Sequence, residues 1–133
     1  YGVFPVADGH VILAPANDRL FGKLMDLLGL GALTRDPRFV TNAGRTANAK
    51  ALDAAIAEAT AGWSKQGLLA ACHAAGVPAG PINRLDETFA DPQVAERGMR
   101  VDLGGVPGVR SPFVFSEAEL ALDRPSPMLG EDG

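Results

Sequence analysis

The sequence predicts an α+β fold, in which a small helical domain with a β-hairpin or short sheet is followed by an extended connector with short strands. Three observations predict this class. Asp8-Gly9 separates two β-branched runs near the start, apolar residues recur at helical spacing from 17 to 75, and proline and glycine interrupt the chain after Gly76. A length of 133 residues fits one domain with a sizeable core.

The N-terminal hairpin is expected from the residues on both sides of Asp8-Gly9. The apolar residues of the two strands are Val3, Phe4 and Val6 before the turn and Val11, Ile12 and Leu13 after it. Glycine accepts the positive φ that a tight turn requires. Pro5 has no N–H to donate to a ladder, so the first strand is expected to be an edge strand or to be bulged there.

Helices are expected between the hairpin and Gly76. Asn17 can cap the first helix and Gly29 ends it, and Ser64 and Gly76 have the same roles for the last. The apolar face of the first helix comprises Leu20, Phe21, Leu24, Met25, Leu27 and Leu28. A longer helix is expected over residues 43–61. Its alanines step by four at Ala47, Ala51, Ala55 and Ala59, beside Leu52 and Ile56.

The chain changes character after Gly76. Pro78 and Pro81 hold residues 77–82 extended, because proline fixes φ and disfavours helix in the residue before it. Short elements are expected next: helices at 85–89 and 92–97, then strand pieces at 99–103 and 113–115 on either side of a Gly/Pro loop. Residues 124–133 lack periodicity and are expected to be irregular, and disordered without a parent domain.

The composition excludes several classes of protein. Apolar residues make up 47% of the chain, charged residues 21%, and the net charge is -4, all ordinary for a soluble globular protein. The 12 basic residues are scattered among 16 acidic ones, which argues against binding to nucleic acid. Apolar runs are far shorter than the roughly 20 residues of a membrane-spanning helix. The single cysteine, Cys72, excludes an internal disulfide and fits a reducing, cytoplasmic compartment.

A series of short motifs runs along the chain in a fixed order. They are Asp8-Gly9, Asn17, Asp36-Pro37-Arg38-Phe39, Asn42 with Arg45, Gly76-Val77-Pro78-Ala79-Gly80-Pro81, Asp91-Pro92-Gln93, Arg97-Gly98-Met99, Ser111-Pro112-Phe113 with Phe115-Ser116, and Pro127-Met128-Leu129-Gly130-Glu131. Each is common loop chemistry when taken alone. In this order they resemble the C-terminal part of the family III CoA-transferases, which include formyl-CoA and carnitine CoA-transferases and acyl-CoA racemases.

The resemblance implies a longer parent enzyme, an interlocked homodimer with a large Rossmann-like domain. Residues 1–84 would be its small α/β domain, and residues 85–133 a connector and return segment toward the absent large domain. The start at Tyr1, with no initiator Met and no cleavable leader, fits the same expectation. The family's acyl group passes through an aspartyl thioester, and that Asp, like a glycine-rich loop preceding Tyr1, would lie outside this chain.

Several residues invite a functional interpretation that a structural one outweighs. Cys72 and His73 are adjacent, so on a helix they point about 100° apart and cannot act as a nucleophile and base. His10 and His73 lack partners at metal-ligand spacing, so we expect no metal site. Asp8 could be a general base, but local hydrogen bonding in a turn explains it more simply.

The arginines and the proline tract are the remaining candidates. Arg38, Arg45 and Arg97 could bind CoA phosphates, although pairing with Asp36 or Glu96, or capping of helix ends, explains them equally well. The prolines of residues 76–81 remove the N–H groups that a phosphate-binding loop must present. Trp63 is expected to anchor the core between the second and third helices. We therefore assign no catalytic residue and leave the cofactor-binding residues open.

The function expected from these observations is that of a CoA-transferase fragment. The parent would move CoA between an acyl-CoA and a carboxylic acid, with coenzyme A thioesters as substrates and no cofactor bound by this fragment. We expect the isolated chain to be inactive and to bind CoA weakly or not at all. An acyl-CoA racemase fragment and a free-standing dimerisation or interaction module are the alternatives, the latter motivated by apolar strand pieces after residue 100. Substrates and oligomeric state stay open, and residues 100–133 are expected to pack poorly or to exchange between chains.

Overall fold

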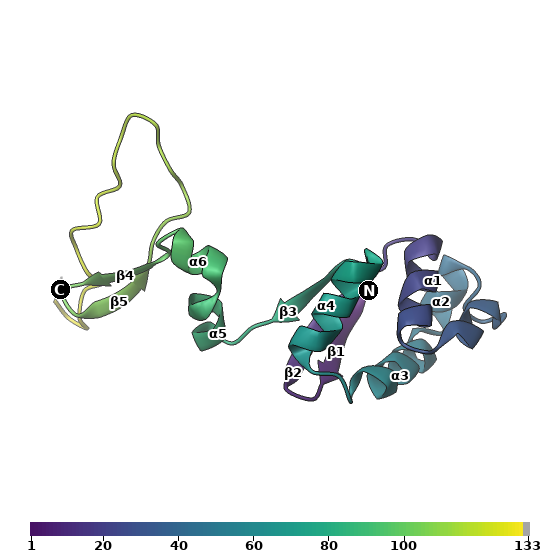
Figure 1. The fold of residues 1–133 in the computed structure, drawn as a ribbon. Helices are drawn as coiled ribbons and strands as arrows, with labels where there is room; N and C mark the ends of the chain where they lie inside the picture. The colour runs from purple at the N-terminus through teal and green to yellow at the C-terminus, as the bar shows by residue number, and fades with distance from the viewer. Residues whose placement is uncertain (132–133) are drawn as a thin grey trace. The chain divides into compact units, whose positions relative to one another are not determined.

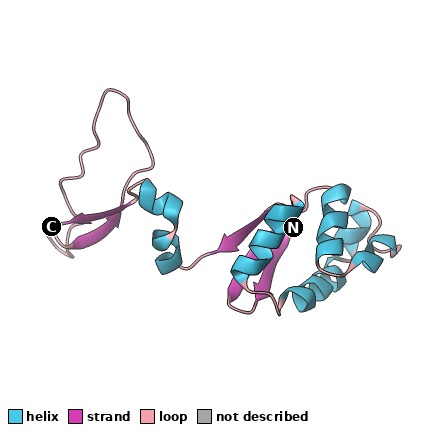
Figure 2. Ribbon diagram, in the orientation of Figure 1, coloured by secondary structure: helices cyan, strands magenta, loops and turns pink. Residues whose placement is uncertain are grey.

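The computed structural model describes residues 1–131, which confirm the predicted α+β fold (Figures 1 and 2). The chain divides into two units, Tyr1–Ile82 and Asn83–Gly133. Among the described residues, every helix is too short or too polar to cross a bilayer.

The first unit contains the hairpin and the main helices. Its elements are β1 (Gly2–Val6), β2 (Gly9–Leu13), α1 (Asp18–Leu27), the 3-10 helix η1 (Gly31–Arg35), α2 (Asn42–Ala47), α3 (Ala49–Thr60), α4 (Lys65–Ala75) and β3 (Ala79–Ile82). The second unit contains α5 (Leu85–Ala90), α6 (Pro92–Glu96), β4 (Arg100–Leu103) and β5 (Val106–Val109).

The sheet of the first unit has the strand order β1-β2-β3, with both neighbouring pairs antiparallel. Val6 lies opposite Gly9, so the hairpin is confirmed, and Gly9 adopts a φ of 148° that favours glycine. Pro5 faces His10 in an unbroken register, which makes β1 an edge strand without a bulge. At the other edge, β3 contains Pro81. Each edge strand therefore lacks one backbone N–H.

One face of this sheet forms the core with the helices. Phe4 and Val6 of β1 and Val11 and Leu13 of β2 alternate with more exposed residues, so they point to the same side. Figure 1 shows α4 lying across the sheet, and α1 and α3 pack in the same unit. The helix residues buried in this core are Phe21, Leu24, Met25, Leu52, Ile56, Leu68 and Cys72. Burial of a side chain of this size stabilises the fold by about 1.5–3 kcal/mol.

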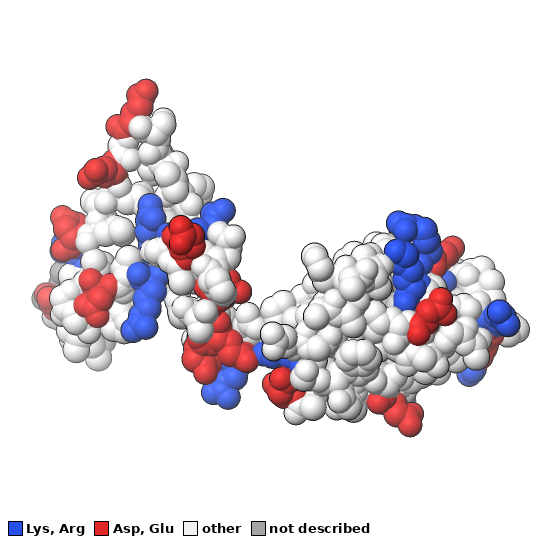
Figure 3. Space-filling view, viewed as in Figure 1, with Lys and Arg blue, Asp and Glu red and all other residues white. Residues whose placement is uncertain are grey.

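The predicted ends of α1 and α4 are confirmed in detail. The Asn17 side-chain oxygen accepts a hydrogen bond from the Leu20 N–H at 2.9 Å, and the Ser64 hydroxyl accepts one from the Gly67 N–H at 3.1 Å. Gly76 ends α4 with a φ of 64°, the left-handed conformation that residues with a Cβ disfavour. α4 carries no charged residue after Lys65, and the face drawn in Figure 3 is largely uncharged where this helix lies.

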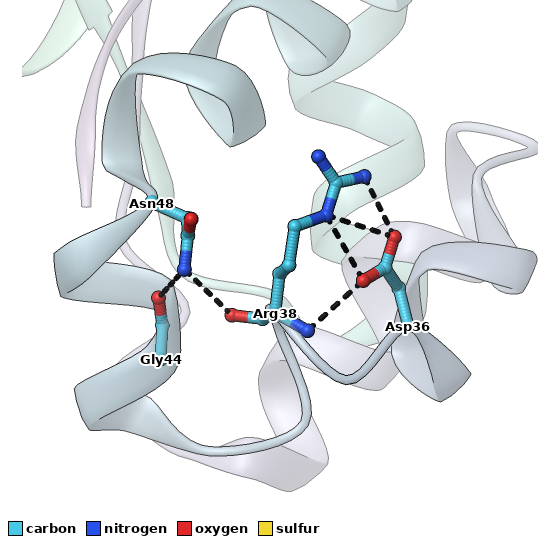
Figure 4. A network of polar contacts seen from close by, with 4 residues as sticks. All are labelled: Asp36, Arg38, Gly44 and Asn48. Carbon is cyan, nitrogen blue, oxygen red and sulfur yellow. Dashed lines mark hydrogen bonds and ion pairs between the residues drawn. The ribbon is translucent and has the colours of Figure 1, made fainter.

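The prediction of one helix over residues 43–61 is wrong, because the chain breaks at Asn48 into α2 and α3. The Asn48 side-chain amide donates to the carbonyl oxygens of Gly44 at 2.9 Å and Arg38 at 3.4 Å (Figure 4). An asparagine that bonds backbone carbonyls in this way competes with the helix ladder. In α3 the buried stripe is Leu52, Ile56 and Thr60, whereas the alanine row is exposed or half-buried.

The corner between α3 and α4 is hydrogen-bonded to the hairpin. The Thr60 hydroxyl donates to the Pro5 carbonyl at 2.8 Å, and the Ala7 N–H donates to the Trp63 carbonyl at 2.8 Å. The Asp8 carboxylate accepts from the Lys65 N–H at 2.6 Å. The expectation of purely local bonding by Asp8 is therefore corrected: this side chain caps the start of a helix distant in sequence. Trp63 is half-buried against the core.

The second unit contains a β-hairpin whose second strand is predicted incorrectly from the sequence. β4 pairs with β5 through Gly104 and Gly105, whose φ values of 64° and 86° suit a tight turn. The strand predicted at 113–115 is wrong, since that segment is irregular and the partner strand is Val106–Val109. Phe113 and Phe115 are 69% and 56% exposed, consistent with poor packing after residue 100.

The end of the second unit follows the sequence expectation as far as the structure describes it. Residues 124–131 form no helix or strand. The last part of the segment predicted to be irregular and disordered, residues 132–133, lies outside the described residues.

Replacement of Thr60 by Val tests the bond between the corner and the hairpin. Thr60→Val keeps the shape of the side chain but leaves the Pro5 carbonyl without its donor, so we expect a loss of about 1–3 kcal/mol in unfolding free energy. Trp63 fluorescence during urea unfolding measures it. Thr46→Val, which removes a hydroxyl bonded to the Asn42 carbonyl on an exposed helix, is the control and should change stability by less than about 0.5 kcal/mol. Equal effects of the two variants on the unfolding free energy would contradict the stabilising role of the bond from Thr60 to the Pro5 carbonyl.

Candidate functional site

An open cavity of about 280 Å³ lies within the first unit, between the hairpin and the helices α1, α2 and α3. Its floor consists of the apolar residues Phe4, Leu13, Phe21, Leu24, Leu52 and Ile56. Its remaining lining residues are Tyr1, Pro15, Asn42, Arg45, Thr46, Ala49 and Asp53. A concave site with an apolar floor and a few polar groups is the usual form of a small-molecule site.

The helix break at Asn48 shapes this cavity. α2 ends just before it, and α3 starts just after it with Ala49, a small residue on the cavity wall. Leu52 and Ile56 follow on the same side of α3 at helical spacing. The break therefore allows polar residues of α2 and apolar residues of α3 to line the same cavity.

Arg45 is the most constrained charged residue of the cavity. Its side chain is only 11% exposed and pairs with the Asp18 carboxylate at the start of α1. One guanidinium nitrogen donates to the Phe39 carbonyl at 3.0 Å, and the guanidinium carbon lies 4.5 Å from the centre of the Phe21 ring. Packing, hydrogen bonds and charge are thus all satisfied within the fold. Arg45 therefore has a structural role, but its partner is Asp18 and not the Asp36 or Glu96 that the sequence suggested.

Arg38 forms a separate ion pair on the surface, outside the cavity lining (Figure 4). Its guanidinium donates to both carboxylate oxygens of Asp36, the shortest contact being 2.8 Å from Nη2 to Oδ2. Hydrogen bonds from the Arg38 side chain, and then from its backbone N–H, hold the pKa of Asp36 below its ordinary value. The same pairing raises the pKa of Arg38. Arg38 therefore makes the pairing with Asp36 that the sequence suggested.

The other candidates are dispersed. Cys72 is fully buried, and burial raises the pKa of its thiol, so it is a core residue and not an activated nucleophile. His10 lies on β2 and His73 on α4, both exposed. Arg97 lies in the second unit, after α6. No group of three or more His, Cys, Asp or Glu residues within 1–131 could hold a metal ion.

The structure brings forward residues that the sequence did not single out. Thr46 and Asp53 line the cavity although nothing in their spacing predicts it. Asn42 was noted only beside Arg45 in the family-like motif series, and it lines the same cavity. The cavity supplies hydrogen-bonding groups and an apolar floor, so it is suited to binding a small molecule.

Comparison with known proteins identifies the family. The family model that describes CoA-transferase family III matches residues 1–133 of this chain. The chain belongs to CoA-transferase family III. Within that family it is 48% identical to the succinate–glutarate CoA-transferase of Agrobacterium fabrum over 98% of this chain and 34% of the relative. It is 37% identical to the acetyl-CoA:oxalate CoA-transferase of Acetobacter aceti over 100% of this chain and 34% of that protein.

A solved structure of the family shares the fold. A CAIB/BAIF family protein from Brucella suis superimposes with a TM-score of 0.87 and 51% identity, over 100% of this chain and 35% of that protein. This family III chain therefore spans about a third of the length of the relatives it matches. The resemblance predicted from the ordered motifs is confirmed.

Replacement of Arg45 by Lys tests whether its planar guanidinium fixes the cavity wall. Lys keeps the charge but cannot stack on Phe21 while also donating to Asp18 and Phe39, so Arg45→Lys should lower the unfolding free energy by about 1–2 kcal/mol. Arg19→Lys, an exposed change on α1, is the matched control and should have no measurable effect. Urea unfolding of both variants measures the difference, and an unchanged midpoint for Arg45→Lys would exclude this role.

The pKa of Asp36 is open to direct measurement. In Arg38→Gln we expect the pKa of Asp36 to rise toward its ordinary value, because the charged donor is lost. A pKa lowered in the folded state stabilises the protein at neutral pH, and this contribution disappears as the pH falls through the folded pKa. Carboxyl-carbon NMR titration of both proteins measures the shift. An identical Asp36 titration in the two would show that Arg38 is not the cause.

Proposed function

We propose that this chain is the C-terminal portion of an enzyme that moves CoA between an acyl-CoA and a carboxylic acid through an aspartyl thioester. The observation that carries the proposal is the family III match over residues 1–133, together with relatives named as CoA-transferases. These names favour transfer over the racemase alternative.

The reaction requires a carboxylate that attacks a thioester. An Asp carboxylate would attack the acyl carbonyl, forming a mixed anhydride and releasing CoA as a thiolate. The thiolate would then attack the aspartyl carbonyl, so that the first acid leaves and the aspartyl thioester remains. The second acid would reverse these steps. Within 1–131 the buried polar side chain is Thr60, whereas Asp53 in the cavity lining and Asp18, the partner of Arg45, are exposed. We therefore place the nucleophile outside this chain.

The acceptor that we propose is a dicarboxylic acid. The two relatives above are named for succinate, glutarate and oxalate, and a succinyl-CoA:glutarate CoA-transferase from Homo sapiens is 29% identical over 98% of this chain and 31% of its own length. Each of these acids carries two carboxylates on a short carbon skeleton, so an acceptor site for any of them must bind a second carboxylate beside the one that reacts.

The organisation that we propose is a small domain over residues 1–84 and a connector and return segment over 85–133. The division between Ile82 and Asn83 supports a boundary near this point. The proposal includes a cytoplasmic interlocked homodimer. The exposed Phe113 and Phe115 would be covered in that assembly. The same exposure motivates the alternative of a free-standing interaction module.

An exchange assay tests the function. The complete gene product that contains these residues should convert succinyl-CoA and glutarate into glutaryl-CoA and succinate, followed by mass spectrometry. The 133-residue chain alone should show no turnover, since it lacks the nucleophile. Turnover by the chain alone would refute our placement of the nucleophile outside this chain. Inversion of a 2-methylacyl-CoA without CoA exchange would establish the racemase, and neither activity in the complete product would favour the interaction module.

A further inference from the structure

The sheet of the first unit has an outer face, opposite the side that forms the core with the helices. Its residues alternate with the core residues along the strands and are Val3, Pro5, His10, Ile12, Gly80 and Ile82. We propose that the outer face is the surface on which the remainder of the parent polypeptide packs an apolar layer. The inference rests on the proposed function only in requiring a longer parent chain.

The outer face is a continuous apolar surface across the strands. Its cross-strand rows are Val3–Ile12–Gly80 and Pro5–His10–Ile82. A Cβ built on Gly80 would lie 3.4 Å from the Cγ2 methyl of Ile12, so the Ile12 side chain extends over this glycine. Val3 and Ile82 are 54% and 43% exposed at opposite ends of the two rows. Branched aliphatic side chains of this size are usually buried, so their exposure together on one surface marks an interaction site.

The residue pattern of the strands indicates that both faces of the sheet are covered in the complete protein. An antiparallel sheet with one face in water alternates apolar residues inward with polar residues outward. In β1 and β2 the outward positions are apolar as well, except for His10, and none of the six outer-face residues is Asp, Glu, Lys or Arg. The exposed side of α1, in the same unit, carries Asp18, Arg19, Lys23 and Asp26. Water is therefore the environment for which α1 is suited, and the outer face is suited to an apolar partner.

The size of the outer face identifies the occupant. Strands of five residues are about 16 Å long and three of them span about 14 Å, which gives roughly 200–250 Å². A stable complex between separate chains buries about 800 Å² on each partner, so this face alone cannot hold a second copy. A segment of the same polypeptide needs less area, because the covalent connection keeps its effective concentration high. The chain spans about a third of the length of its relatives, so the remainder of the parent can supply the segment.

Cysteine labelling of the complete gene product tests the inference. Val3→Cys and Val40→Cys place thiols at positions of nearly equal exposure, 54% and 51%, and Val40 lies outside the sheet, just before α2. The thiol at position 3 should react with a maleimide about tenfold more slowly than the thiol at position 40 in the native protein, and equally fast in urea. Peptide mass spectrometry measures both rates. Ile82→Cys, on the same face, should be protected like Val3→Cys.

Two results would overturn the inference. One is labelling at position 3 as fast as at position 40 in the native protein, which would show that the outer face is open to water. The other is a disulfide between two copies of Val3→Cys on mild oxidation, which would assign the face to a second copy. If Val3→Cys fails to fold, Ile82→Cys decides with the same control. The labelling requires no substrate and no turnover, so failure of this inference and failure of the proposed function remain distinct.

Discussion

The hydrogen bond from Thr60 to the Pro5 carbonyl is the contact on which the arrangement of the first unit depends. It joins the last residue of α3 to the free edge of β1, and it is flanked by the bonds of Ala7 to Trp63 and of Lys65 to Asp8. The corner between α3 and α4 is thereby attached to β1 and to the two turn residues that follow it. With that corner fixed, α3 must run along β1, and α4 must start beside the turn and cross the sheet. The apolar core then fills the space between them.

The cavity follows from the same arrangement. α3 is held at its end by Thr60 and begins directly after Asn48, whose side chain bonds carbonyl groups on both α2 and the preceding loop. Arg45 ties α2 to α1 through Asp18 and Phe21. The walls are therefore set by contacts within the protein before any ligand arrives. A site built in this way loses little conformational entropy when it binds.

Local signals in the sequence predict most of this fold. The caps at Asn17 and Ser64, the glycines that end α1 and α4, and the hairpin turn each depend on residues within one turn of each other. The break at Asn48 could not be predicted in this way, because one of its carbonyl partners belongs to Arg38, ten residues earlier. The hydrogen bonds of Thr60 and Asp8 could not be predicted for the same reason, since their partners lie 55 and 57 residues away.

The candidate site was less predictable than the fold, and the second unit shows why a local signal can still mislead. Asp53 and Thr46 have the spacing of ordinary helix-surface residues, and only the helix break between α2 and α3 brings them to one cavity, so their position depends on the tertiary structure.

For β5 the sequence does contain a signal. Gly104 and Gly105 form a tight turn, but the Pro and Gly that follow resemble a loop. The aromatic segment after Pro112 has the composition of a strand but no paired neighbour among the described residues.

Pro5 and Pro81 have a consequence for how this chain behaves at high concentration. Each lies in an outer strand at a position whose N–H would otherwise point away from the sheet, and Thr60 occupies the carbonyl of Pro5. An incoming extended peptide would find too few donors on either side to dock in register. Each proline therefore weakens the pairing of another extended chain with its edge of the small sheet.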